Sequence, residues 1–285
     1  MSKNVLVTGA NGQLGQEIQA IAIDYDMNFF FTDVEDLDLT QAEDVRLFIE
    51  NKDIDLVINC AAYTAVDKAE DEPEVAYKVN AEAVKNLAEA VFGKACLIHI
   101  STDYVFSGKQ TNPIKETEQL DPQSVYGRSK LAGELALQAA CPNSIIIRTA
   151  WLYSVYGNNF VKTILRLGAE RDSLNVVCDQ LGTPTYASDL ARAIMTMVSE
   201  REFVPGIYHY SNEGEANWFD FAQAIVKNAG LTCVINPVST SEYPTKATRP
   251  SYSILDKTKI KETFHITIPQ WEESLIKCID LLKAN

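Results

Sequence analysis

Hydrophobic positions in the first half of the chain follow two alternating periods. Short apolar runs rich in β-branched residues are typical of buried strands, and longer stretches repeat apolar residues every three or four positions, as helices do. The expected strands are residues 5–8, 29–32, 56–60, 95–100 and 144–149. Helices of this length between successive strands favour right-handed crossovers. The pattern therefore predicts an α/β fold with a parallel, doubly wound sheet.

Helices are expected where apolar residues recur at helical spacing: after Leu14, from Thr40, over residues 73–91 and over residues 124–140. Thr40 has Glu43 three positions later, which predicts a capping box at the start of the second helix. The stretch 73–91 is expected to place five apolar residues on one side: Val75, Val79, Ala83, Leu87 and Ala90.

After Trp151 the alternation becomes less regular. Helices are expected over residues 159–171, 188–200, 218–228 and 270–282, strands over 175–178 and 207–211, and a Pro/Ser/Thr-rich connector over 237–255. We therefore predict two parts, a dinucleotide-binding domain of residues 1–150 and a smaller substrate-binding lobe of residues 151–285. The lobe is expected to pack over the carboxyl edge of the sheet, with segments of the two parts free to interleave.

Composition and charge narrow the class of partner. A net charge of −14 disfavours binding to nucleic acid or to anionic lipid, although a local pocket can still accept an anionic substrate. No apolar run approaches the roughly 20 residues that span a bilayer. The six cysteines lie far apart, without a CxxC pair or a metal-ligand spacing. Together these features predict a cytoplasmic protein with reduced thiols and no metal held by cysteines. The sequence does not fix the oligomeric state, and a monomer or a homodimer is expected.

A glycine-rich loop follows the first expected strand and opens the first helix. Gly9, Gly12 and Gly15 are spaced as in a dinucleotide fingerprint. Gly9 permits the tight turn, Gly12 lets the pyrophosphate approach the backbone, and Gly15 lets the helix pack on the sheet. The free N–H groups at the helix start favour phosphate. A plain surface turn is the alternative, but the coincidence of strand, loop and helix favours a cofactor site.

Asp33 ends the second strand, where an acid can accept a hydrogen bond from the adenosine ribose. Asp38 and Leu39 could flank the adenine, while a solvated loop aspartate is the alternative for Asp33. Residues 32–38 contain four acids and neither Lys nor Arg. A 2′-phosphate would find no local cation there, although folding could bring in Arg46. The cofactor is therefore expected to be NADPH or NADH, with NADH used at least as well.

Tyr126 and Lys130 form a YxxxK pair, whose members share one face of a helix. A lysine cation near a phenol favours the phenolate, which brings the phenol toward acid–base catalysis. Ser101 and Thr102 end the fourth strand, where ligands bind in open α/β sheets. One of these hydroxyls could hold a substrate oxygen while Tyr126 delivers a proton. The alternative for Ser101 and Thr102 is that their hydroxyls only cap a loop. The alternative for Tyr126 and Lys130 is that they are ordinary helix-surface residues.

Trp151 follows the fifth strand, beside the expected pocket. An indole there could cover a sugar and exclude water, and its N–H could bond a hydroxyl. A tryptophan that only fills the core is the alternative. Small residues end the third strand at Ala61 and Ala62, which would let the cofactor lie close, although tight packing alone would also explain them.

These features together resemble the extended short-chain dehydrogenase/reductase family of Rossmann-fold enzymes, and within it the dTDP-4-dehydrorhamnose reductases. The resemblance covers essentially the whole chain. It rests on residues 9–15, 60–70, 101–106, 126–134, 148–151, 157–160, 179–185 and 249–250.

The resemblance implies a role for each matching residue. Cofactor contacts are implied for Gly9, Gly12, Gln13, Leu14, Gly15, Asp33, Asp38, Leu39, Ala62, Tyr63, Thr64, Tyr126 and Lys130. A catalytic triad of Thr102, Tyr126 and Lys130 is implied, with Thr102, Asp103 and Trp151 contacting a dTDP-sugar nucleotide. The implied reaction is hydride transfer to C4 of dTDP-4-dehydro-L-rhamnose, the last step of dTDP-L-rhamnose synthesis.

One departure from the family concerns metal. Some bacterial members hold Mg²⁺ with glutamates at a subunit contact, and Glu17 matches one such position. Ser188 stands before Asp189 where an acid would be needed. Because Mg²⁺ prefers several hard oxygen ligands, no structural metal is expected.

Two other functions remain open at this point. A nucleotide-sugar epimerase or dehydratase would share the fold, but a dehydratase is expected to carry an acid pair after the strand-four hydroxyl, where only Asp103 stands. A regulatory subunit of methionine adenosyltransferase would also share it. A degraded triad and stable association with a synthetase would distinguish that subunit, and here the triad is intact.

Overall fold

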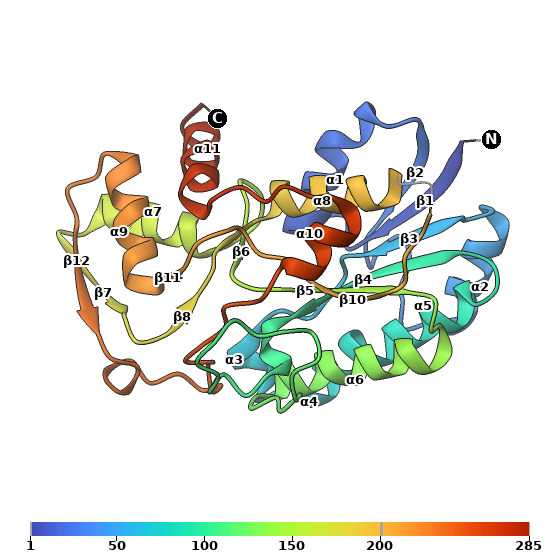
Figure 1. Cartoon of the computed structure of the whole chain (residues 1–285), viewed down its shortest axis with the longest axis horizontal. Helices are drawn as coiled ribbons and strands as arrows, with labels where there is room; N and C mark the ends of the chain where they lie inside the picture. Colours follow the sequence, from blue (N-terminus) through green and yellow to red (C-terminus); the bar gives the residue numbers. More distant parts are fainter. Residues whose placement is uncertain (1, 200–201, 285) are drawn as a thin grey trace.

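The computed structural model describes residues 2–199 and 202–284. Six parallel strands form the central sheet in the order β10-β5-β4-β3-β1-β2 (Figure 1). The strands are β1 Lys3–Thr8, β2 Met27–Thr32, β3 Leu56–Asn59, β4 Cys96–Thr102, β5 Ile145–Thr149 and β10 Gly206–His209. The strand order reverses between β1 and β3, which places a ligand crevice at their carboxyl ends. The parallel, doubly wound α/β prediction is confirmed.

Helices cover both faces of this sheet (Figure 1). On one face, α1 Gln13–Ile21, α8 Ala187–Ser199 and α10 Thr258–Phe264 contribute buried side chains to one apolar cluster with the strands. On the other face, α2 Ala42–Asn51, α5 Ala83–Val91 and α6 Val125–Ala140 contribute to a second cluster. The β-branched strand residues are buried from both sides, as in parallel sheets generally.

The stretch 73–91 is helical, but a π turn divides it. Helix α4 Pro73–Tyr77 leads into the π turn η2 Lys78–Glu82 and then into α5. The wider turn rotates α4 relative to α5, so Val75 is 45% exposed instead of sharing the buried face. The same turn directs the buried side chain of Asn80 toward the main chain of Tyr63.

The predicted capping box at Thr40 is wrong. Helix α2 begins at Ala42, after Gln41 as the N-cap residue. The Thr40 hydroxyl instead donates to the carboxylate of Asp38 at 2.8 Å. Glu43 pairs with Arg46 on the surface of the helix. The helix therefore starts one residue later than the predicted capping box requires, because local hydrogen bonds engage Thr40 in the loop.

A smaller lobe is built mainly from the second half of the chain. Its core holds side chains from α7 Phe160–Glu170, α9 Trp218–Ala229 and α11 Trp271–Ala284 and from the parallel pair β7 Ser173–Val177 and β12 Val234–Val238. Helix α8 and strand β10 belong instead to the central sheet region, so the two parts interleave. The expected helix 188–200 runs to Ser199, and Glu200 lies outside the described residues.

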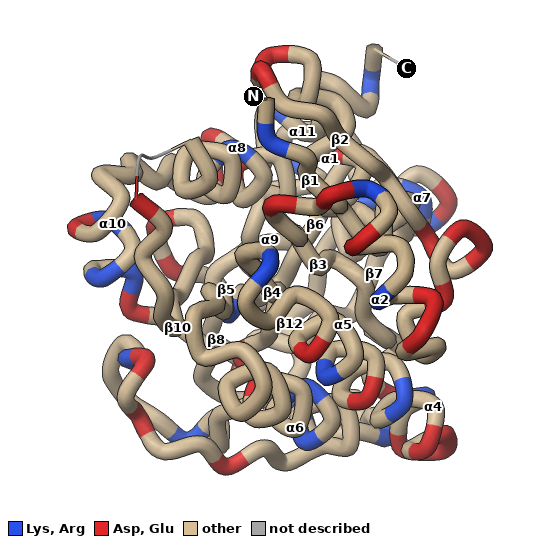
Figure 2. The backbone as a smooth tube through the Cα atoms, turned by 90° about the vertical axis from the view of Figure 1, so that its right-hand side faces the viewer, with Lys and Arg blue, Asp and Glu red and all other residues tan. Residues whose placement is uncertain are grey.

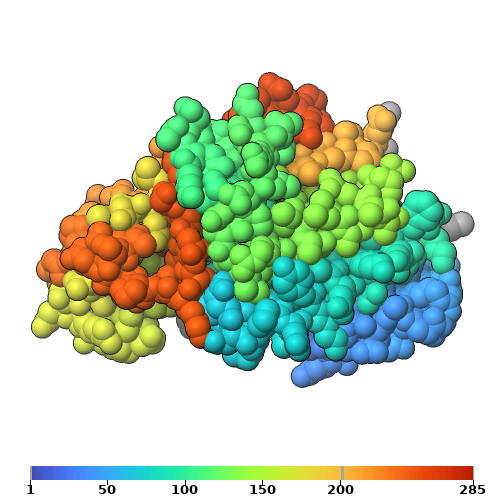
Figure 3. Space-filling view, turned by 90° about the horizontal axis from the view of Figure 1, so that it is seen from below, coloured from blue at the N-terminus to red at the C-terminus, as the bar shows by residue number. Residues whose placement is uncertain are grey.

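Within the described residues, two short strand pairs and several loops connect the lobes. The strands β6 Leu152–Tyr153 and β9 Thr185–Tyr186 pair in parallel, and β8 Leu181–Gly182 pairs with β11 Ala216–Asn217. The segment between β12 and α10 runs along the junction of the lobes, where it meets the α3 region (Figure 3). Two ion pairs hold it there, Arg249 with Asp67 of α3 (Val66–Ala69) and Lys246 with Asp71.

Surface charge agrees with the acidic composition. Asp and Glu residues are spread over many surface elements of the backbone (Figure 2). In the described ranges all six cysteines are free thiols, three of them buried. Across residues 2–199 and 202–284, no helix has the length and apolar character needed to cross a bilayer.

Candidate active site

The glycine-rich loop lies between the end of β1 and the start of α1. Gly9 adopts a φ of +64°, and a Cβ there would lie 2.6 Å from the amide nitrogen of Ala61. At Gly15 a Cβ would lie 2.4 Å from the Gly9 carbonyl oxygen, so only glycine lets the helix pack this closely. Gly12 is the N-cap residue of α1, and no side chain caps the helix. The loop therefore has the shape and the helix end that a pyrophosphate requires.

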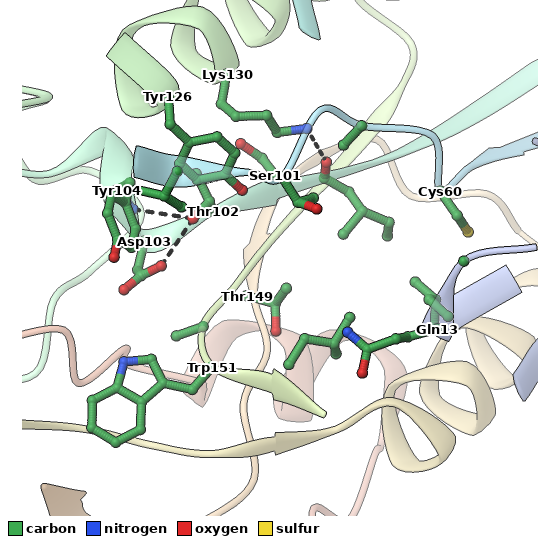
Figure 4. A pocket seen from close by; sticks show the side chains of 18 of the residues that line it. Gln13, Cys60, Ser101, Thr102, Asp103, Tyr104, Tyr126, Lys130, Thr149 and Trp151 are labelled. Carbon is green, nitrogen blue, oxygen red and sulfur yellow. Dashed lines mark hydrogen bonds between the residues drawn. The ribbon is translucent and has the colours of Figure 1, made fainter. Parts of the chain in front are cut away.

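Two adjoining cavities flank the loop. One of about 460 Å³ is lined by the predicted adenosine-side residues Asp33, Asp38 and Leu39. The other, of about 530 Å³, holds the expected catalytic residues (Figure 4). Gly12 and Ala62 line both cavities. A single extended ligand could therefore place its adenosine in one cavity and its reactive end in the other.

The adenosine-side cavity is acidic. Asp33 accepts hydrogen bonds from the backbone N–H of Asn11 at 2.9 Å and of Val34 at 2.8 Å, which fix the carboxylate at the strand end. No Lys or Arg is among the described residues that line this cavity. Arg46, the distant cation considered above, is engaged by Glu43 and Glu50 on α2.

The third strand's end is held by two asparagines. Asn59 Oδ1 accepts from the Ala61 backbone N–H at 3.1 Å, and Asn80 bonds both the N–H and the carbonyl of Tyr63. Tyr63 turns its hydroxyl to Glu72, and its neighbour Thr64 lines the larger cavity. Residues 62–64, which are predicted to contact the cofactor, therefore form a fixed wall between the two cavities.

The structure brings Thr102, Tyr126 and Lys130 to one wall of the larger cavity (Figure 4). Thr102 is the last residue of β4, and the other two lie on the first turns of α6. Ser124 caps α6 by accepting from the Gly127 N–H at 3.1 Å, which fixes the helix start and hence the position of Tyr126.

Of the two hydroxyls that end β4, Thr102 is the one available to substrate. Ser101 donates at 2.5 Å to Glu134, which is itself bound by the buried guanidinium of Arg148. Thr102 donates to the carboxylate of Asp103 at 2.9 Å and lies in the cavity with Tyr126. Both residues line the cavity, but the Ser101 hydroxyl is engaged by the buried Glu134.

Burial shifts the pKa values of this cluster strongly. It raises the pKa of the Tyr126 phenol to about 12, with the Thr102 hydroxyl acting in the opposite direction. It raises the pKa of Asp103 to about 6 and lowers the pKa of Lys130 to about 8. Tyr126 is therefore protonated at neutral pH, and clustered shifts of this size are common at catalytic sites.

Lys130 is held by groups other than the phenol. Its ammonium donates to the main-chain carbonyl of Ile100 at 2.7 Å and lies 3.4 Å from Nε2 of His99. No hydrogen bond joins it to Tyr126 in the described part of the chain. The lysine is thus oriented by β4, with its nitrogen at the inner end of the cavity.

Trp151 lines the cavity on the side opposite Tyr126 (Figure 4). Its φ of +49° is unusual for a bulky residue, and its ring stacks on Trp218 with centroids 3.6 Å apart. A Cβ at Gly182 would lie 2.7 Å from the indole, so the ring is clamped from a second side. Backbone strain at a cavity wall is typical of functional positions.

Several site residues were not expected from the sequence. Cys60, Thr149 and Asn158 also line the larger cavity, and Trp218 supports its wall from α9. Trp218 is a sequence-distant partner that no spacing rule connects to Trp151. Cys60, Thr149 and Asn158 lie in stretches that support the family resemblance, which was the available indication for them.

The possible metal position is occupied by protein contacts. The carboxylate of Glu17 accepts from the Ser154 hydroxyl at 2.6 Å, and burial raises its pKa. In the portion of the chain that the structure describes, no group of three His, Cys, Asp or Glu side chains could hold a metal ion. The absence of a metal stays a prediction.

Comparisons with known proteins show the family of the chain. A family model described as the RmlD substrate binding domain matches residues 3–284. The dTDP-4-dehydrorhamnose reductase of Aggregatibacter actinomycetemcomitans is 42% identical, over 95% of this chain and 96% of that protein.

Two crystal structures extend the similarity to the fold. A dTDP-4-dehydrorhamnose reductase from Clostridium acetobutylicum is 45% identical with a TM-score of 0.94, over 98% of this chain and 99% of that one. The reductase from Bacillus anthracis, in complex with NADP, is 39% identical with a TM-score of 0.95, over 99% and 100% of the two chains. The chain therefore belongs to the RmlD substrate-binding family, together with these dTDP-4-dehydrorhamnose reductases.

Proposed function

We propose that this chain catalyses the NADPH- or NADH-dependent reduction of the C4 ketone of dTDP-4-dehydro-L-rhamnose to dTDP-L-rhamnose. The observation that carries the proposal is the protonated phenol of Tyr126 in a cavity continuous with the dinucleotide loop. Relatives named for this reaction match the chain over nearly its full length.

The chain's own residues perform the binding steps. Uncapped N–H groups at the start of α1 would hold the pyrophosphate, and Asp33 would accept from a ribose hydroxyl of the cofactor. The indole of Trp151 would cover the sugar and exclude water from the opposite wall. When bound, the reduced nicotinamide supplies the hydride for the ketone carbon.

Proton delivery to the ketone oxygen falls to Tyr126. Since the pKa of the phenol is about 12, the group carries its proton at neutral pH and can act as a general acid. Thr102 lowers that pKa, which eases departure of the proton as charge develops on the substrate oxygen. The Lys130 cation then stabilises the phenolate left on Tyr126.

No observation favours the alternative functions. A dehydratase is expected to carry an acid pair after the strand-four hydroxyl, whereas only Asp103 stands there, buried and hydrogen-bonded to Thr102. A purely regulatory subunit would not need the triad to line a cavity with the dinucleotide loop. We place the activity in the cytoplasm, where the six thiols would stay reduced.

The proposal is tested by mixing the purified protein with reduced cofactor and dTDP-4-dehydrorhamnose and following the nicotinamide absorbance. Loss of absorbance with equal formation of dTDP-L-rhamnose is expected. The matched control is the UDP analogue of the same keto sugar, which tests whether the base contributes. Failure to oxidise the cofactor with either sugar nucleotide would rule out the proposed reaction.

A further inference from the structure

A row of polar side chains crosses the middle of the sheet beneath the active site. Thr8, Asn59 and His99 occupy paired positions on the adjacent strands β1, β3 and β4. Each is at most 1% exposed. The Thr8 hydroxyl donates to Asn59 Oδ1 at 2.8 Å, and Asn59 Nδ2 lies 3.0 Å from His99 Nδ1. The row ends at the Lys130 nitrogen, 3.4 Å from His99 Nε2.

The orientation of the Asn59 amide is determined by a backbone group. Its Oδ1 accepts from the Ala61 N–H at 3.1 Å, and a main-chain N–H can only donate. The opposite orientation would set the amide NH₂ against that N–H. The Asn59 NH₂ group must therefore point at His99, and it can only donate there.

This orientation determines where the proton of His99 lies. Burial and the nearby Lys130 lower the pKa of His99 well below its ordinary value, so the ring is neutral and carries a single N–H. Because Nδ1 accepts from Asn59, that N–H must be on Nε2. The Nε2–H group then faces the Lys130 nitrogen.

An N–H donor beside the lysine disfavours its protonated form, because two donors cannot hydrogen-bond to each other. The 3.4 Å separation exceeds the usual 2.7–3.2 Å of an N–H hydrogen bond, as expected when both groups carry protons. Loss of a proton would give Lys130 a lone pair that could accept from Nε2–H. The other ionisable groups that face the lysine are Glu134 of α6, which favours the cation but is paired with Arg148, and the Cys60 thiol.

We propose that His99 is a positioning residue that keeps its proton on Nε2 and thereby lowers the proton affinity of Lys130. The lysine then gains and loses its proton near physiological pH while staying fixed to the Ile100 carbonyl. The catalytic consequence rests on the role proposed above for Lys130, but the tautomer and its effect on the lysine do not.

Nitrogen NMR of the ¹⁵N-histidine-labelled protein tests the tautomer without any activity assay. The chain has three histidines, His99, His209 and His265. Substituting His209 and His265 by Gln, one at a time, assigns the spectrum without altering the buried row. His209 is an internal control, because its Nδ1 lies 3.0 Å from the Ile114 carbonyl and must carry the proton.

His99 and His209 are therefore expected to show opposite tautomers, both neutral across the physiological pH range. An Nδ1–H tautomer at His99, or a charged ring, would overturn the proposal. Asn59→Asp keeps the size of the side chain but reverses its hydrogen-bonding role toward His99. A carboxylate would accept from Nδ1–H and so move the proton from Nε2 to Nδ1. The tautomer should switch in that variant.

The effect on the lysine is measured by following the Lys130 resonance of ¹⁵N-lysine-labelled protein through a pH titration. His99→Gln offers a carbonyl acceptor to the lysine, so the pKa of Lys130 should rise by about one unit. His209→Gln, which removes an equally buried ring on β10, should leave that pKa unchanged. An unchanged pKa in folded His99→Gln would refute the coupling, whereas loss of reductase activity alone would concern only the proposed function.

Discussion

The buried ion pair between Arg148 and Glu134 offers a quantitative test of how the site is supported. Both side chains are 1% exposed, and three hydrogen bonds of 2.6, 2.9 and 3.3 Å join them. Glu134 also accepts from Ser101, so the pair fastens the end of β4, which carries Thr102, to α6. Glu134→Gln keeps the shape and the acceptor for Ser101, but it leaves the guanidinium buried without a counter-charge.

Breaking a buried pair by neutralising one partner typically costs about 3–5 kcal/mol. In a chain of this size about 1 kcal/mol corresponds to roughly 2–4 °C, so Glu134→Gln should lower the Tm by about 6–20 °C. Arg148→Met should cost a similar amount. Because the double variant leaves no unpaired charge, its loss should fall short of the sum of the single losses by about 2–3 kcal/mol.

Urea unfolding followed by circular dichroism gives the free energies for this cycle. The matched control is Glu170→Gln, which removes a partner from the exposed Arg166–Glu170 pair and should cost under about 0.5 kcal/mol. If Glu134→Gln were as mild as Glu170→Gln, or if the losses of the double variant simply added, the buried pair would not support the site as argued.

Three further outcomes are expected. Trp151→Ala should weaken binding of the sugar nucleotide several-fold in calorimetry while cofactor affinity stays intact; a parallel loss of both, together with a lower Tm, would make the residue part of the core only. Because the pKa of Lys130 is about 8 and its cation is needed to stabilise the phenolate, kcat/KM for reduction should fall as pH rises through about 8; a rate flat to pH 10 would contradict this. With Asp33 and no lining cation at the adenosine end, kcat/KM for NADH should equal or exceed that for NADPH; a strong NADPH preference would refute the argument.

Local patterns were sufficient to predict the sheet and much of the site. Strand periodicity located strands β1 to β5 of the central sheet, because buried parallel strands are continuous apolar runs, and the expected strand at 207–211 corresponds to β10. The dinucleotide loop and the YxxxK pair were recognisable because each depends on spacing within one element. The order of these motifs along the chain then placed them at one sheet edge.

Contacts between distant segments could not be predicted in the same way. The stack of Trp151 on Trp218 joins residues of different elements, and no periodicity relates them. Ser101 and Thr102 are adjacent, yet only the position of Glu134 shows which hydroxyl is bound to the buried ion pair and which is bound to Asp103 beside Tyr126. The π turn at Lys78–Glu82 likewise coincides with a contact between distant segments, the hydrogen bond of Asn80 to Tyr63.

The central claim is that Tyr126 protonates the ketone oxygen during hydride transfer, and Tyr126→Phe tests it most directly. The variant keeps the ring and its edge contact with Tyr104 but removes the acid. With saturating NADPH and dTDP-4-dehydrorhamnose, and with folding verified by the melting curve, kcat should fall by about 10² to 10⁴ while cofactor affinity barely changes. Turnover within a few-fold of the parent enzyme would show that another group donates the proton and would contradict the account.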